Sequence, residues 1–181
     1  ISIDEFLVNN GFSAPKILNV DHENGFILLE DLGDETYGRV LATAPEKELQ
    51  LYEKACDCLI ELHEIQLPKN IRPYNAAELF REVMLFVDWY VPHHGKKMNL
   101  SEKAEYRHAW FKLFDLLDKE NQVLVLRDYH ADNLMALPAR SGFKQVGLLD
   151  FQDALIGSKA YDLVSLLEDA RRDVDAKNRE K

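Results

Sequence analysis

Apolar residues recur at helical spacing along much of the chain. From residue 45 onward they follow alternating three- and four-residue steps, which predicts an amphipathic helix of several turns that begins at a proline. The same spacing predicts helices over 76–91 and 101–119, and a last helix over 161–176. The side chains expected to face inward are Leu49, Tyr52, Cys56, Leu59 and His63 on the first helix, Leu79, Val83, Phe86, Val87 and Tyr90 on the second, and Ala104, Phe111, Phe114 and Leu117 on the third.

Short apolar runs and turn residues predict strands elsewhere. A short helix over 2–10 precedes two strands, 15–20 and 26–30, which are joined by a polar turn and therefore predict a β-hairpin. Two further apolar runs, 123–126 and 146–149, each lead directly into a charged residue. Helices dominate the middle and strands lie at both sides of it, so the pattern predicts an α+β fold.

Composition places the chain among ordinary soluble globular proteins, with 46% hydrophobic and 30% charged residues. Its net charge of -10 repels phosphate backbones, so we expect no nucleic-acid partner. The same charge means that a nucleotide site would need a divalent cation such as Mg²⁺. Cys56 and Cys58 diverge on a helix and make no thiolate metal site. No apolar run is long enough to span a bilayer, so we expect no membrane partner and a location in the reducing cytoplasm.

Three polar residues follow the two C-terminal apolar runs at a spacing typical of phosphoryl transfer. Asp128 comes just after the first run and five residues before Asn133, and Asp150 directly follows the second run. Such a trio positions an acceptor hydroxyl and metal ions. The first carboxylate accepts the hydroxyl proton, while the amide and the second carboxylate are hard oxygen ligands for Mg²⁺. Isolated Asp and Asn are more often turn residues, but here the order and setting of both motifs agree.

The two motifs resemble those of a known family. Residues 127–135, Arg-Asp-Tyr-His-Ala-Asp-Asn-Leu-Met, look like the catalytic loop of the aminoglycoside phosphotransferase and choline kinase-like enzymes, which share the protein-kinase fold. Residues 149–154, Leu-Asp-Phe-Gln-Asp-Ala, look like their magnesium-binding motif. With the segment 160–167, the chain is most similar to the bacterial anomeric kinases of N-acetylmuramate and N-acetylglucosamine. The resemblance implies transfer of the γ-phosphoryl group of ATP to a hydroxyl of a small molecule, an amino sugar.

The resemblance also implies a hinge between the lobes and a side chain that donates a hydrogen bond to the transferred phosphate. The backbone carbonyl of Glu30 and the amide of Leu32 would hold the adenine edge, although a strand that ends in a turn explains the same residues almost as well. His130 stands two residues after Asp128, where protein kinases place a lysine near the transferred phosphate. A histidine packed within the loop is the alternative.

Further residues take supporting or substrate-contacting roles by the same resemblance. Asp162 would accept hydrogen bonds from catalytic-loop amides, or would simply be a first-turn acid favoured by the helix dipole. Asp153 would contact sugar or metal, or be a solvated carboxylate. The remaining candidates are Arg127 in a supporting role, and Glu82, Trp89 and Tyr90 near the acceptor unless they belong to the core.

The resemblance divides the chain into residues 1–32, a remnant of the small lobe with the hinge, and residues 33–181, a mainly helical catalytic lobe. No glycine-rich loop or lysine-bearing strand precedes the hinge, and Leu126 replaces a histidine often found two residues before the catalytic Asp. We therefore expect a chain shortened at both ends, which folds but transfers phosphate negligibly by itself.

Two other functions stay open from the sequence. An aminoglycoside or choline is an alternative acceptor, because the fold and the catalytic loop do not select the acceptor. A non-catalytic relative that binds nucleotide or a partner protein is the second alternative, against which the intact Asp128, Asn133 and Asp150 argue.

Overall fold

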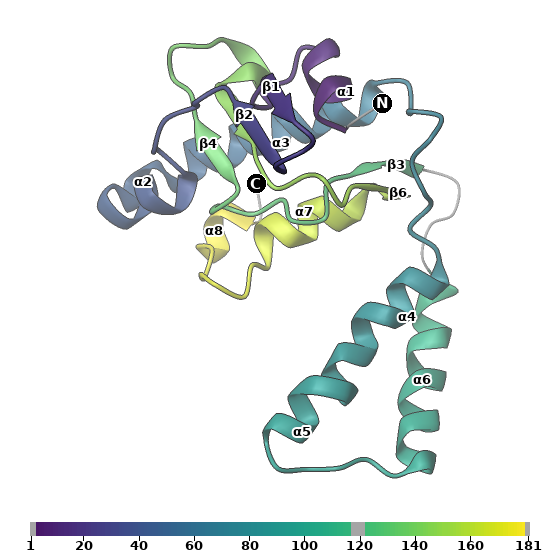
Figure 1. Ribbon diagram of the computed structural model, residues 1–181. Helices are drawn as coiled ribbons and strands as arrows, with labels where there is room; N and C mark the ends of the chain where they lie inside the picture. The colour runs from purple at the N-terminus through teal and green to yellow at the C-terminus, as the bar shows by residue number, and fades with distance from the viewer. Residues whose placement is uncertain (1–2, 117–121, 180–181) are drawn as a thin grey trace.

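A computed structural model describes residues 3–116 and 122–179. The chain forms a body of short sheets and helices, from which residues 76–114 extend as a helical arm (Figure 1). The helices are α1 Ile3–Asn9, α2 Tyr37–Thr43, α3 Glu48–Glu64, α4 Ala76–Leu85, α5 Val91–His93, α6 Leu100–Phe114, α7 Ala160–Leu167 and α8 Ala176–Arg179. The strands are β1 Ile17–Asp21, β2 Phe26–Leu29, β3 Gln122–Val125, β4 Leu134–Ala136, β5 Val146–Leu148 and β6 Leu155–Ser158.

The described strands form three antiparallel pairs, and two of these pairs place the motif loops. β1 pairs with β2 as the predicted hairpin. The run that precedes Asp128 is β3, which pairs with β6, and the run that precedes Asp150 is β5, which pairs with β4. Strands β4 and β6 and helix α2 were not predicted. The two partner strands are only three and four residues long, too short for a clear alternating pattern.

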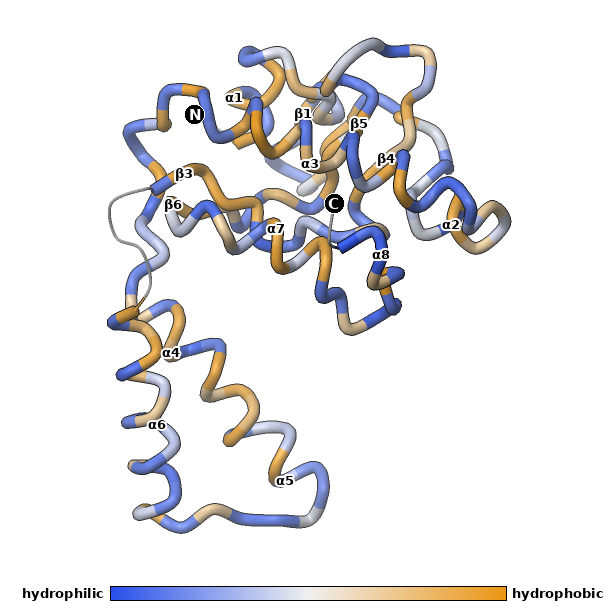
Figure 2. Tube along the Cα trace, turned by 180° about the vertical axis from the view of Figure 1, so that it is seen from behind, coloured by the Kyte–Doolittle hydropathy of each residue, from blue (hydrophilic) through white to orange (hydrophobic). Residues whose placement is uncertain are grey.

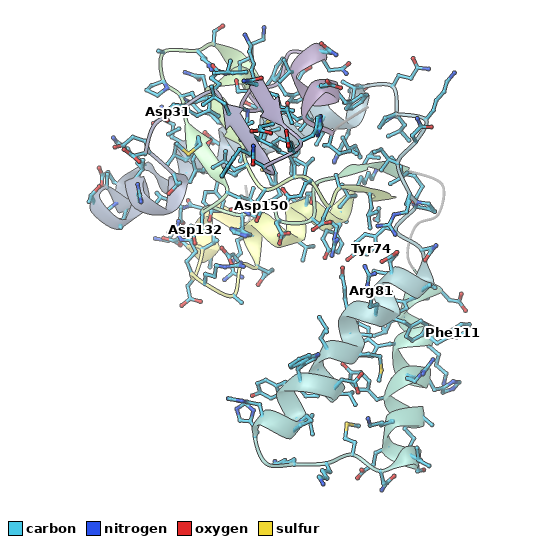
Figure 3. The ribbon with its side chains drawn as sticks, in the orientation of Figure 1. Asp31, Tyr74, Arg81, Phe111, Asp132 and Asp150 are labelled. Atoms are coloured by element: carbon cyan, nitrogen blue, oxygen red, sulfur yellow. The ribbon has the colours of Figure 1, made fainter. Side chains whose placement is uncertain are left out.

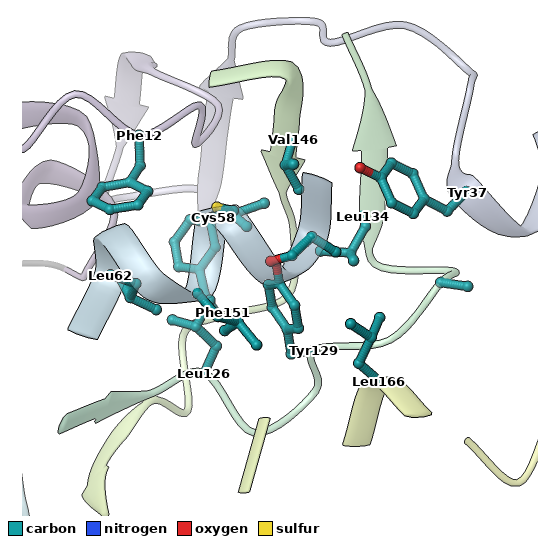
Figure 4. Packing of buried hydrophobic residues seen from close by; sticks show 14 of the residues in the cluster. Phe12, Tyr37, Cys58, Leu62, Leu126, Tyr129, Leu134, Val146, Phe151 and Leu166 are labelled. Carbon is teal, nitrogen blue, oxygen red and sulfur yellow. The ribbon is translucent and has the colours of Figure 1, made fainter. Parts of the chain in front are cut away.

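The main core lies against α3. The apolar side chains that α3 buries in this core are Leu51, Tyr52, Ala55, Cys58, Leu59 and Leu62. Figure 4 shows Cys58 and Leu62 among residues from the later loops. The predicted face was correct at Tyr52 and Leu59, whereas Leu49, Cys56 and His63 lie at its half-buried edge. The buried face is therefore rotated slightly relative to the sequence pattern.

The arm departs from the predicted inward faces. Val87 and Phe114 are buried, but Phe86, Tyr90 and Phe111 are 45%, 53% and 52% exposed. Phe86 stacks on Tyr106 of α6 and Phe111 stacks on Phe80 of α4, so these rings lie at the edge of a contact between two helices that project from the body and remain half exposed (Figure 2). A π-helical turn over Phe86–Tyr90 also shifts the helical phase there. α6 ends at Phe114, while Leu117 and the expected helix end at 119 lie outside the described residues.

The prediction of one helix over 161–176 was wrong. α7 ends at Leu167, and the chain turns before α8 begins at Ala176. Buried Glu48 explains the turn, because its carboxylate accepts from Arg172 at 2.7 Å, from the amide of Asp175 at 2.9 Å and from Asn178 at 2.8 Å. These contacts across more than 120 positions outweigh the local helical pattern.

Candidate active site

Asp128 lies exposed in a loop that its own neighbours hold in shape. The carbonyl oxygen of Asp128 accepts from the amide of His130 at 3.1 Å and from Asn133 Nδ2 at 3.1 Å. In the same loop, the hydroxyl of buried Tyr129 donates to the carbonyl of Ala55 in α3 at 2.8 Å. The backbone around Asp128 is therefore fixed to the core while its carboxylate faces solvent.

The second motif meets the first through the pairing of β4 with β5 and a backbone hydrogen bond beside it. The amide of Leu149 donates to the carbonyl of Asn133 at 3.0 Å, which brings Asp150 beside Asn133. Asn133 Nδ2 then lies 3.4 Å from Asp150 Oδ2, and Gln152 donates to the other oxygen. Figure 3 shows Asp150 in this region of the body. Asp150 has φ of 56°, a left-handed conformation that is uncommon outside glycine and often found at functional sites.

The pair of Asn133 and Asp150 fits a weakly held Mg²⁺. Among residues 3–116 and 122–179, no group of three or more His, Cys, Asp or Glu side chains could hold a metal ion. Mg²⁺ is instead commonly bound by one or two protein oxygens together with water and substrate phosphates. One exposed carboxylate beside one amide oxygen supplies that donor set, with the amide turned to present Oδ1.

His130 and Asp153 lie next to this site and contact its residues. His130 is 6% exposed, and its Nε2 lies 3.3 Å from Asn133 Nδ2, so its ring contacts the amide group of Asn133. Asp153 is exposed, and its backbone carbonyl accepts from Arg127 Nη1 at 3.4 Å.

Asp162 holds the start of the loop that carries Asp128. Its two carboxylate oxygens accept from the amides of Leu126 at 2.7 Å and Arg127 at 2.9 Å. Arg127 has φ of 74°, and these hydrogen bonds stabilise that left-handed conformation immediately before Asp128. Burial raises the pKa of Asp162 to about 6, the charge of Asp128 adds to the rise, and the two amide donors oppose it.

The predicted hinge lies next to the strand that leads to Asp150. Glu30 accepts from Arg140 at 2.9 Å and from the amide of Lys16 at 3.3 Å. A Cβ on Gly147 of β5 would stand 3.2 Å from the side chain of Leu32. Both predicted hinge residues are thus held by side-chain contacts. Glu30 contacts Arg140 in the loop between β4 and β5, and Leu32 lies against Gly147 of β5.

Tyr74 and Tyr161 belong to this region and were not predicted. Their hydroxyls are 2.9 Å apart, and Tyr74 also donates to Glu82. The two tyrosines are 87 positions apart, so no local pattern could have indicated their contact.

An exposed Asp at the start of a braced loop, beside an Asn and a second Asp, is the arrangement found in phosphotransferases with a protein-kinase-like fold. A family model described as the phosphotransferase enzyme family matches residues 2–180, and the chain belongs to that family. This confirms the predicted family and the α+β, protein-kinase-like fold.

The chain is 37% identical to an N-acetylmuramate/N-acetylglucosamine kinase of Caulobacter vibrioides, over 91% of this chain and 47% of that protein. A protein of the same name from Pseudomonas aeruginosa is also 37% identical, over 94% of this chain and 48% of its own length. The chain therefore spans about half the length of the curated relatives it matches.

Solved structures share the fold at lower identity. An aminoglycoside phosphotransferase from Streptomyces rimosus, in complex with ADP and streptomycin, has a TM-score of 0.64 at 16% identity, covering 98% of this chain and 68% of its own. An ethanolamine kinase from Plasmodium vivax has a TM-score of 0.58 at 18% identity, covering 97% of this chain and 53% of its own.

Proposed function

We propose that this chain carries the catalytic lobe of an ATP-dependent kinase that phosphorylates the anomeric hydroxyl of an N-acetylated amino sugar. The observation that carries the proposal is the meeting of Asp128, Asn133 and Asp150 in one braced pair of loops. Residues 1–32 would supply the end of a nucleotide-binding small lobe and the hinge, and residues 33–181 the lobe that holds the acceptor. The cytoplasmic location stays part of the proposal.

In the proposed mechanism Asp128 orients the acceptor hydroxyl and accepts its proton as the hydroxyl oxygen bonds to the γ-phosphorus of ATP, whose bond to the bridging oxygen breaks and releases ADP. Exposure of its carboxylate supports this role, because an acceptor can reach it. Asn133 and Asp150 would hold Mg²⁺, which when bound neutralises charge on the triphosphate. His130, packed against Asn133, would keep the Asn133 amide in position. The phosphate contact that the sequence suggested for His130 stays a prediction.

The remaining site residues support the two loops. Asp162 fixes the backbone of Arg127 and so the direction in which Asp128 points. Glu30 and Leu32 would present their backbone groups to the adenine edge, and Asp153 stays a candidate for contact with sugar or metal.

The choice of acceptor rests on the relatives. Those with 32–37% identity are named N-acetylmuramate/N-acetylglucosamine kinases. An aminoglycoside is the second candidate, because the fold is shared with aminoglycoside phosphotransferases and an acidic chain of charge -10 attracts a cationic acceptor.

A coupled assay for ADP release separates the candidates. The full-length gene product is tested with N-acetylmuramate, N-acetylglucosamine, kanamycin and choline, with and without Mg²⁺. We expect turnover of the two N-acetylated sugars that depends on Mg²⁺. Preferred turnover of kanamycin or choline would overturn the acceptor, and no ADP release above the sugar-free rate would overturn the kinase itself.

A further inference from the structure

Four side chains join the arm to the catalytic loop at a single point. Glu82 of α4 contacts Arg127 through one carboxylate oxygen and the hydroxyl of Tyr74 through the other. The hydroxyl of Tyr161 in α7 lies 2.9 Å from the Tyr74 hydroxyl and can donate to it. We call Tyr74, Glu82, Arg127 and Tyr161 the junction cluster, and Figure 3 shows Tyr74 where the arm meets the body.

The ion pair in the junction cluster is largely shielded from solvent. The side chains of Arg127 and Glu82 are 21% and 26% exposed, and the Arg127 guanidinium lies 5.6 Å from the centre of the Tyr74 ring. Exposed ion pairs contribute little, whereas loss of one partner of a shielded pair leaves the other charge without compensation. Removal of either charge would therefore leave the other uncompensated, so the pair links α4 to the residue before Asp128.

Arg127 connects this contact to the reacting group. Its amide is held by Asp162, its carbonyl accepts from Ser165 at 3.3 Å, and its φ of 74° immediately precedes Asp128. The backbone of Arg127 is thus fixed by α7, while its side chain is fixed by α4. A shift of α4 would pull on a strained residue directly beside Asp128.

Packing around the junction cluster leaves room for such a shift. Cavities of about 320 and 410 Å³ lie at the root of the arm, and both are lined by Tyr74, Leu79 and Ser158. Leu79, one turn before Glu82, packs against a small apolar cluster of the body. Beyond Glu82 the arm extends away from the body (Figure 1). The polar contacts of Glu82 and the apolar contact of Leu79 therefore hold the root of the arm against the body.

We propose that Glu82 is a positioning residue for phosphoryl transfer, which acts through Arg127 to couple the position of the arm to the orientation of Asp128. The proposal rests on the proposed function, because it assigns Glu82 a part in that reaction. Glu82 would not contact the transferred group. Its carboxylate would keep the arm and the catalytic loop in the one arrangement in which Asp128 faces the acceptor hydroxyl.

The test uses the full-length gene product with Glu82→Gln, Arg127→Met and the double variant. Glu82→Gln keeps the size of the side chain and an acceptor for Tyr74 but removes the charge that holds Arg127. The matched control is Glu78→Gln, one turn earlier on α4, because Glu78 contacts Arg72 and Arg81 rather than the catalytic loop. Turnover, acceptor KM, nucleotide affinity by calorimetry and melting temperature are measured for each.

We expect Glu82→Gln to lower kcat at least about fivefold and raise the acceptor KM, with nucleotide affinity unchanged, and we expect little change in Glu78→Gln. In the Arg127→Met background, Glu82→Gln should have no further effect. Equal kcat in the two glutamine variants, or effects of Glu82 and Arg127 that simply multiply, would overturn the proposal.

Amide hydrogen exchange over residues 126–134 tests the proposal without relying on turnover. Glu82→Gln should speed exchange in this loop, and Glu78→Gln should not. If the wild type transfers no phosphate to any acceptor, the proposed function fails, and the exchange data alone decide whether Glu82 holds the loop. Unchanged exchange in Glu82→Gln would then overturn the coupling.

Discussion

Asp128 is the single residue on which the proposed chemistry depends most. Asp128→Asn keeps the shape of the side chain and removes the carboxylate that accepts the hydroxyl proton. We expect turnover of the full-length protein to fall by roughly 10²–10⁴-fold, with nucleotide affinity nearly unchanged, because no proposed metal ligand is lost. ADP release and calorimetry measure the two quantities. Turnover within a few-fold of the wild type would remove Asp128 from its role.

Asp150 should behave differently, because its carboxylate is a proposed Mg²⁺ ligand. Asp150→Asn is the sharper substitution than alanine, since asparagine tolerates the left-handed φ of 56°. We expect nucleotide affinity to lose most of its dependence on Mg²⁺, which calorimetry with and without the ion reports. The control is Asp173→Asn, an exposed carboxylate outside the two motif loops. An unchanged magnesium dependence in Asp150→Asn would refute the assignment.

Asp162 gives a prediction for stability against pH. Its pKa rises from 3.8 to about 6 on folding, so the folded state holds the extra proton between these values. The resulting stabilisation is fully present below pH 3.8 and is lost as the pH rises through about 6. At ~1.4 kcal/mol per pKa unit, the wild type should gain about 1 kcal/mol between pH 7 and pH 5.

Asp162→Asn lacks this proton, so it isolates the effect from the other carboxylates. We expect the difference in unfolding free energy between wild type and Asp162→Asn, measured in urea, to be about 1 kcal/mol larger at pH 5 than at pH 7. A difference that does not change with pH, or that shrinks on acidification, would mean that Asp162 is ionised throughout this range.

The pairing of β4 with β5 is the element on which the geometry of both motif loops depends. Gly147 of β5 faces Met135 of β4, and a Cβ at Gly147 would stand 2.7 Å from the Cβ of Met135. Neither atom can rotate away, so Gly147→Ala must spread the strands. We expect a loss of roughly 1–3 kcal/mol in the free energy of unfolding, measured by urea denaturation.

Gly157 of β6 provides the matched control, because a Cβ there would meet its nearest atom at 3.1 Å. Gly157→Ala should cost clearly less than Gly147→Ala. The reverse order would show that the β4–β5 pair adjusts more easily than the close contact implies.

For the whole molecule, the prediction concerns phosphoryl transfer by these 181 residues alone. The core around α3 should let them fold, yet no glycine-rich loop precedes Glu30 in this sequence to hold a triphosphate in line. We expect a cooperative thermal transition but negligible single-turnover transfer, with the Caulobacter relative, about twice as long, as the positive control. Comparable rates in the two proteins would mean that the nucleotide site is misplaced.

Local patterns in the sequence predicted the elements that are long or regularly spaced. The front hairpin, the long helix α3 and the two strands that lead to Asp128 and Asp150 follow from runs and periods that neighbouring residues determine. The motifs also grouped Asn133 with Asp150, but the pairing of β4 with β5 that brings the two together was not predicted.

Only the tertiary structure decided which contacts join distant parts of the chain. Glu48 holds the turn between α7 and α8 across more than 120 positions, and the junction cluster connects Tyr74 to Tyr161 across 87. The exposure of Phe86 on the arm likewise depends on how many neighbours the arm has. The physical reason is that a side chain's burial and hydrogen bonds depend on which elements meet in space, whereas the sequence pattern reports only which residues are close along the chain.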